Sequence, residues 1–163
     1  MKQLIGLFLV VLFSMSVVKA EIDAGDNQPL PDIRWSDGQG QQYRLSAIKD
    51  KAKILHFWAA WCIPCRKEMP HLIEWRKQNP DIEVLALSLD ERMAQTKNFI
   101  KKFQLDMPPL LINEDDSEAL GVPIVPYTIF VSFDNRFVGS YAGEAPWQEQ
   151  DFTVQVRELL LNK

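Results

Sequence analysis

The chain contains only two cysteines, Cys62 and Cys65, in the stretch Trp61-Cys-Ile-Pro-Cys. The mainly apolar run 54–60 before them predicts a buried strand, and residues 66–69 begin a predicted helix. Unpaired N–H groups and the helix dipole at a helix N-terminus favour a thiolate over a thiol. The second sulfur lies one turn further on, close enough to form a disulfide with the first. We therefore interpret Cys62 and Cys65 as a redox-active dithiol.

A disulfide that only stabilises the fold is the alternative interpretation of this pair. A disulfide across a loop of about four residues adds roughly 2 kcal/mol to stability, against about 4.7 kcal/mol for a loop of about 100 residues. A bridge for stability would therefore join distant segments, and the short spacing favours redox chemistry. Pro64 is compatible with the first turn of a helix, because the N–H groups there have no partner within the helix.

Residues 1–20 have the layout of a secretory signal peptide. Lys2 gives a positive start, Leu4 to Val18 is almost entirely apolar, and Ala20 is a small residue at the expected cleavage site. An uncleaved membrane anchor is the alternative, but a spanning helix needs about 20 apolar residues. We expect export to the periplasm, an oxidising compartment that permits disulfides, with residues 21–163 as one domain.

The charge of the chain argues against nucleic-acid and anionic-membrane partners. The full sequence has 18 basic and 22 acidic residues; without Lys2 and Lys19 the remainder has 16 basic and 22 acidic residues, a formal charge of −6. Both kinds of partner require a basic surface. The 143 residues after the predicted leader suffice for one domain with its own core.

The predicted elements alternate between strands and helices. A strand, a helix ending near Asn79-Pro80 and a second strand form a βαβ unit over residues 53–89, with a parallel pair of strands. The other predicted elements are a hairpin over 33–45, a helix capped by Asp90 with Met93, Thr96, Ile100 and Phe103 on one face, strands at 110–112, 127–133 and 137–141, and a last helix that opens at Pro146-Trp147. This order predicts a mixed sheet with helices on both faces.

A metal-binding module is a further alternative. Cys62 and Cys65 are suitable ligands for Cu(I), which thiolates select. Structural zinc needs four ligands, and the chain has no second cysteine pair. The acidic run 114–118 lacks the alternating ligands and central glycine of a calcium loop. Zinc and calcium are therefore not expected, and a Cu(I)-binding module remains the alternative. Our main expectation is no metal and no cofactor besides the Cys62–Cys65 disulfide.

The chain resembles the TlpA-like exported thiol–disulfide oxidoreductases of the thioredoxin superfamily. Residues 57–70, Phe-Trp-Ala-Ala-Trp-Cys-Ile-Pro-Cys-Arg-Lys-Glu-Met-Pro, match that family's active-site signature, and Val125-Pro126-Tyr127-Thr128 lies where the family has a cis-proline. The resemblance extends from about Pro31 to the C-terminus. It implies a thioredoxin-like three-layer sandwich with an N-terminal hairpin, and residues 90–113 resemble the insertion of TlpA-like proteins.

The expected reaction passes through a mixed disulfide. Cys62 attacks a substrate disulfide and Cys65 resolves the product, while Trp61, Ile63 and Pro64 shape the site. The resemblance implies that Val125 and Pro126 bind the substrate strand. A reductant is expected because Ile63-Pro64 lacks the histidine of strongly oxidising relatives; an oxidase or isomerase is the alternative. The resemblance suggests protein disulfides as substrates, a membrane electron donor and cytochrome c maturation, and we expect a monomer.

Two further side chains are candidates for proton transfer. Glu68 stands three residues after Cys65 on the same helical face and can take the proton of Cys65; a surface charge is the alternative. His56 occupies a strand position where plain thioredoxins carry Asp and TlpA-like proteins often carry Asn. It is either a proton relay to Cys65 or a neutral, hydrogen-bonded residue of the core.

Overall fold

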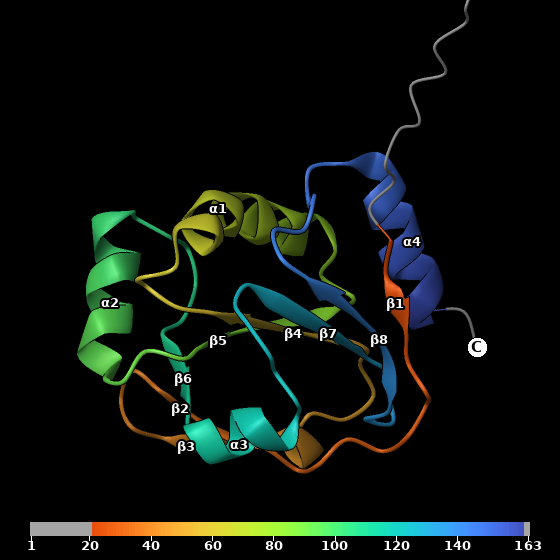
Figure 1. The fold of residues 1–163 in the computed structure, drawn as a ribbon, viewed down its shortest axis with the longest axis horizontal. Coiled ribbons are helices and arrows are strands. Elements are labelled where there is room, and N and C mark those ends of the chain that lie inside the picture. Colours follow the sequence, from red (N-terminus) through yellow and green to blue (C-terminus); the bar gives the residue numbers. More distant parts are fainter. Residues whose placement is uncertain (1–20, 162–163) are drawn as a thin grey trace, which may run out of the picture.

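The computed structural model describes residues 21–161, which form an eight-stranded mixed sheet with helices on both faces (Figure 1). The strands are β1 (Asp23–Ala24), β2 (Arg34–Asp37), β3 (Gln42–Arg44), β4 (Lys53–Trp58), β5 (Glu83–Ser88), β6 (Leu110–Ile112), β7 (Tyr127–Val131) and β8 (Phe137–Ala142). The helices are α1 (Ile63–Gln78), α2 (Met93–Lys102), α3 (Glu114–Ala119) and α4 (Gln150–Leu161), with a 3-10 turn at Leu45–Ala47. The predicted leader, residues 1–20, lies outside the described residues.

The sheet has the order β1-β8-β7-β4-β5-β6-β2-β3, with β4 near its centre. β4 pairs in parallel with β5 and antiparallel with β7, so the βαβ unit and the mixed sheet are confirmed. The predicted hairpin is also present, as β2 and β3. All six residues of β4 are buried, because both faces of the strand are covered.

The side chains of β4 alternate between two hydrophobic cores. Ile54 and Trp58 pack in the core beneath α1, α2 and α4, and Leu55 and Phe57 pack in the core on the opposite face, where α3 lies (Figure 1). With a period of two, His56 belongs to the same face as Ile54 and Trp58. The strand therefore directs His56 toward α1, the helix that begins beside the cysteines.

Two predicted details of α2 are wrong. The residue that caps this helix is Arg92, and Asp90 lies before the cap. Phe99 is buried and packs on Trp58, whereas Phe103 is 46% exposed. The reason is that the apolar face of α2 is centred on Thr96 and Phe99.

The two ends of the described domain also differ from the prediction. The lead-in contains strand β1, which pairs with β8. The last helix begins at Gln150, because Pro146 and Trp147 lie in a turn in which Pro146 O accepts from Glu149 N. Trp147 is buried and packs edge-on against Phe152.

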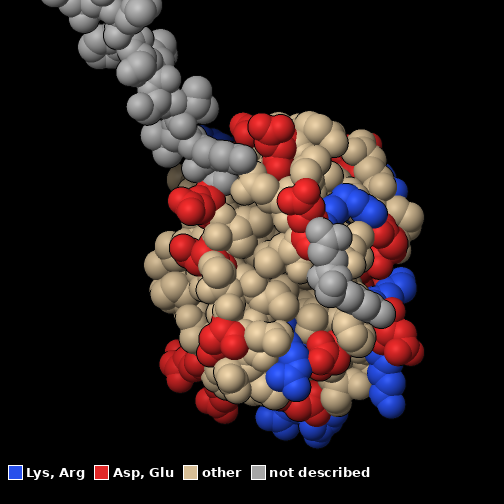
Figure 2. All heavy atoms as spheres, turned by 90° about the vertical axis from the view of Figure 1, so that its right-hand side faces the viewer, with Lys and Arg blue, Asp and Glu red and all other residues tan. Residues whose placement is uncertain are grey.

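No helix among residues 21–161 is long and apolar enough to cross a membrane. On the face of the molecule over β1 and α4, acidic and basic side chains are interspersed on a mostly uncharged surface (Figure 2). This face therefore shows no continuous basic patch.

Candidate active site

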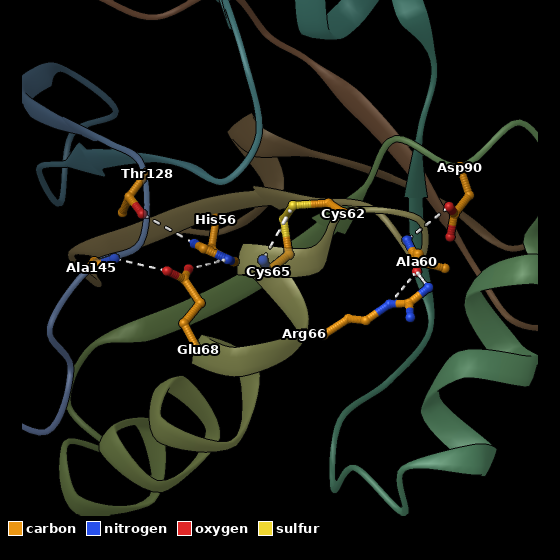
Figure 3. Close-up of a disulfide and its surroundings, with 9 residues drawn as sticks. All are labelled: His56, Ala60, Cys62, Cys65, Arg66, Glu68, Asp90, Thr128 and Ala145. Atoms are coloured by element: carbon orange, nitrogen blue, oxygen red, sulfur yellow. Dashed lines mark hydrogen bonds and ion pairs between the residues drawn. A yellow bond between two sulfur atoms is a disulfide. The ribbon is translucent and has the colours of Figure 1, made fainter.

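The two cysteines form a disulfide at the start of α1 (Figure 3). Cys62 is the N-cap residue of the helix, and its Sγ accepts a hydrogen bond of 3.2 Å from the backbone N–H of Cys65. Pro64 lies in the first turn, as expected. Cys62 is 4% exposed and Cys65 is fully buried, so Cys62 is the more accessible residue of the two. The helix N-terminus thus offers an N–H group directly to the sulfur that is expected to become a thiolate.

The disulfide is bordered by exposed apolar side chains. Trp61 is 63% exposed and Ile63 is 66% exposed, although both are large hydrophobic residues. The Val125–Pro126 peptide bond is cis, which is the form that the resemblance implies. Pro126 is buried and Val125 half-buried, and both precede the first residue of β7.

A buried polar network lies beside Cys65 (Figure 3). Glu68 is 1% exposed, and its Oε1 lies 2.9 Å from Nε2 of His56, which is fully buried. These two atoms meet the distance of an ion pair but not the angle of a hydrogen bond. Nδ1 of His56 lies 3.1 Å from Oγ1 of Thr128, and Glu68 Oε2 accepts from Ala145 N at 2.8 Å. Four separate segments therefore hold one carboxyl–imidazole pair.

The buried positions of Glu68 and His56 bear on the two alternatives that the sequence left open for these residues. Glu68 is not a surface charge, because α1 turns it under the helix together with Cys65. His56 is buried and hydrogen-bonded, and it also contacts a second titratable group. The sequence prediction missed this contact, although two signals pointed to it: the alternation along β4 and the three-residue spacing of Cys65 and Glu68. Burial raises the pKa of Tyr141, and the nearby charge of Glu68 adds to this effect.

A second set of contacts holds the segment before Cys62 (Figure 3). The backbone N–H of Ala60 donates to Oδ1 of Asp90 at 2.9 Å. Nε and Nη2 of Arg66 donate to the carbonyl oxygen of Ala60 at 2.9 and 2.7 Å. The sequence analysis missed both contacts, because it assigned Asp90 to the cap of α2 and the partners lie apart along the chain.

Within the described part of the chain, no group of three or more His, Cys, Asp or Glu side chains is arranged to hold a metal ion. His71, the other histidine, is exposed on α1.

A disulfide at the strand–helix junction of this mixed sheet, in a chain that also has a cis-proline at the start of β7, is the arrangement of a thioredoxin-fold thiol–disulfide oxidoreductase. Residues 27–135 match the AhpC/TSA family, and the chain belongs to this thioredoxin-like family. The protein is therefore an enzyme that exchanges thiols and disulfides.

Individual relatives agree with this class. The chain is 30% identical over 130 residues to a thiol-disulfide oxidoreductase ResA of Bacillus cereus, covering 77% of this chain and 74% of the relative. It is 33% identical over 111 residues to ResA of Geobacillus thermodenitrificans, covering 65% and 63%.

Solved structures share the fold. A putative thiol:disulfide interchange protein DsbE from Chlorobium tepidum superposes with a TM-score of 0.71 at 20% identity, covering 85% of this chain and 99% of that one. A DsbF homologue from Corynebacterium diphtheriae gives a TM-score of 0.68 at 24% identity, covering 80% and 87%. At these identities the likeness is one of fold.

Proposed function

We propose that this enzyme is an exported reductant of protein disulfides that works through a Cys62–Cys65 dithiol cycle. The observation that carries the proposal is the asymmetry of the pair: Cys62 caps the helix and is the more accessible residue, whereas Cys65 is fully buried beside Glu68 and His56. Such an arrangement separates an attacking sulfur from a resolving one.

The reaction transfers two electrons from the dithiol to the substrate. The Cys62 thiolate attacks one sulfur of the substrate disulfide, the substrate S–S bond breaks, and the released sulfur takes up a proton. A mixed disulfide now joins Cys62 to the substrate. Cys65 then loses its proton and attacks Cys62 Sγ, which releases the second substrate sulfur and leaves the Cys62–Cys65 disulfide.

Glu68 and His56 are proposed to accept the proton that Cys65 loses. Cys65 is fully buried, so water does not reach its thiol readily, and a base within the protein is needed. Glu68 lies one helical turn below Cys65, and His56 lies 2.9 Å from the Glu68 carboxyl. The imidazole is able to share or pass on the proton, with Thr128 Oγ1 holding its other nitrogen.

The exposed border of the disulfide is proposed to bind the substrate. Trp61, Ile63 and Pro64 offer apolar surface next to Cys62. The backbone of Val125, before the cis-proline Pro126, is proposed to pair with an extended substrate strand. An exported reductant requires electrons from a membrane protein, and cytochrome c maturation is the destination that the family resemblance suggests. We propose a monomer with residues 1–20 as a cleaved leader.

Replacing Cys65 with serine tests the cycle. The Cys65→Ser enzyme should accumulate a mixed disulfide with an unfolded, disulfide-containing protein, because no resolving thiol remains; non-reducing electrophoresis and mass spectrometry measure it. Cys62→Ser is the matched control and should trap nothing. Equal trapping by both variants, or by neither, contradicts the assigned roles.

A further inference from the structure

Asp90 is a buried carboxyl group that the proposed cycle does not use. Its side chain is 4% exposed, and it follows β5 at the turn that leads to α2. Oδ2 accepts hydrogen bonds of 2.9 Å from the hydroxyls of Ser88 and Thr96, while Oδ1 accepts from Ala60 N. These contacts fix the carboxyl group and, through it, Ala60.

Ala60 is held from both of its backbone groups. Asp90 binds its N–H, and the guanidinium of Arg66 binds its carbonyl oxygen with two nitrogens. The Arg66 guanidinium in turn lies 5.9 Å from the centre of the Phe99 ring on α2. Thr96 and Phe99 are the two buried residues of α2, so both anchors rest on that helix.

Ala60 stands two residues before Cys62, so at most about 7 Å of extended backbone separates them. A loop that is already held in place loses less conformational freedom when a bond closes, which raises the effective concentration of the two thiols for each other. The anchors on Ala60 are engaged in the form with the disulfide closed.

We propose that Asp90 is a positioning residue that holds the segment 60–62 through the Ala60 N–H and thereby favours closure of the Cys62–Cys65 disulfide. The effect is one of position, and it lowers the reduction potential of the pair. The inference rests on the thiol–disulfide cycle of these cysteines, but it holds whether the enzyme acts as reductant or oxidant.

Three substitutions separate the effect of holding Ala60 in position from the effect of the carboxylate charge. Asp90→Ala removes both the hydrogen bond to the Ala60 N–H and the charge. Asp90→Asn removes the charge but keeps an oxygen for the Ala60 N–H, and its amide is able to donate to the Ser88 or Thr96 hydroxyl. Thr96→Val keeps the charge but removes one of the hydroxyls that fix the carboxyl group. Asp32→Ala is the control, because the Asp32 carboxylate likewise accepts from a backbone N–H, that of Ser46, far along the chain from the cysteines.

The measurement is the equilibrium between each full-length variant and glutathione buffers at pH 7, with free thiols alkylated and counted by mass spectrometry. Asp90→Ala should lower the equilibrium constant for disulfide formation about tenfold, a rise of about 30 mV in potential. Thr96→Val should lower it at least threefold, about 14 mV. Asp90→Asn and Asp32→Ala should stay within about twofold of the wild type, which corresponds to about 9 mV.

The proposal is overturned if Asp90→Asn shifts the equilibrium as Asp90→Ala does while Thr96→Val leaves it unchanged, because the carboxylate then acts by charge. It is also overturned if Asp90→Ala, Asp90→Asn and Thr96→Val all have the wild-type equilibrium constant for disulfide formation. If Asp90→Ala does not fold, Asp90→Asn and Thr96→Val still test the proposal. A lowered equilibrium constant in Thr96→Val with a wild-type value in Asp90→Asn supports it, and the reverse contradicts it. Equilibration of the wild-type pair itself tests the redox cycle separately.

Discussion

At the scale of single residues, Glu68 is the side chain through which the buried cysteine is expected to exchange its proton. Its two carboxyl oxygens contact His56 Nε2 and the Ala145 N–H, so the group has a fixed place beneath the disulfide. General bases of this kind contribute about 10²-fold or more to rate. Because of these contacts, replacing Glu68 should have effects that replacing an exposed acidic residue of α1 does not have.

Glu68→Gln should slow oxidation of the reduced enzyme by a disulfide substrate about 10²-fold and change the pH–rate profile, because an amide does not accept the Cys65 proton. Stopped-flow fluorescence of the reduced enzyme measures the rate. Glu74→Gln, an exposed glutamate on the same helix, should behave as the wild type. A wild-type pH profile in Glu68→Gln would contradict proton transfer at this position.

His56→Asn should alter the thiolate titration of the reduced enzyme and lower the free energy of unfolding by about 1–3 kcal/mol, because a shorter side chain leaves the buried Glu68 oxygen without its neighbour. Absorbance at 240 nm follows the thiolates, and urea unfolding follows stability. A loss of stability with an unchanged titration and potential would assign His56 to packing alone.

At the scale of elements, Arg157 of α4 ties this helix to the turn between α1 and β5. Its guanidinium donates to both carboxyl oxygens of Asp81, at 3.0 and 2.9 Å, and to the side chain of Asn79. The hydrogen bond from Arg157 holds the pKa of Asp81 below its usual value of 3.8. A carboxyl group with a lowered pKa stabilises the fold above its unfolded pKa, and this contribution disappears as the pH falls through the folded pKa.

Asp81→Asn should therefore lower the free energy of unfolding at pH 7 by up to about 1 kcal/mol, the range for a partly exposed ion pair. The difference from the wild type should shrink as the pH falls below about 4, the ordinary pKa of an aspartate. Urea unfolding at pH 7 and pH 3 measures both values. Arg157→Met should remove the same pH-dependent contribution to the free energy of unfolding. If the difference between Asp81→Asn and the wild type is as large at pH 3 as at pH 7, the pair acts only through packing.

At the scale of the whole molecule, the stability of the two redox forms reports the direction of the enzyme. A strong oxidant is one whose reduced form is the more stable, so a reductant should be more stable when oxidised. Chain entropy for a four-residue loop gives about 2 kcal/mol in favour of the oxidised form. We expect urea unfolding to show a difference of this sign and size.

The measurement compares the protein with and without a phosphine reductant, which leaves no thiol additive in the equilibrium. Cys62→Ser serves as the control, because its stability should not respond to the reductant. A reduced form that is more stable than the oxidised form would indicate an oxidase and contradict the proposed direction.

The sequence by itself determined the features that depend on neighbours along the chain. The burial of β4, the start of α1 at the cysteines and the parallel βαβ unit follow from period-two and period-3.6 patterns and from the preferences of a helix N-terminus. For the same reason, Cys65 and Glu68 were correctly placed on one face of a single helix.

Only the tertiary structure decided which distant groups meet at the site. Thr128 lies 72 residues from His56, Ala145 lies 77 residues from Glu68, and Asp90 lies 30 residues from Ala60. Local patterns set which face a side chain occupies, but the register of β7 against β4 and the packing of the loops set its partner. Asp90 therefore looked like a helix cap in the sequence and became an anchor of the segment before Cys62 in the fold.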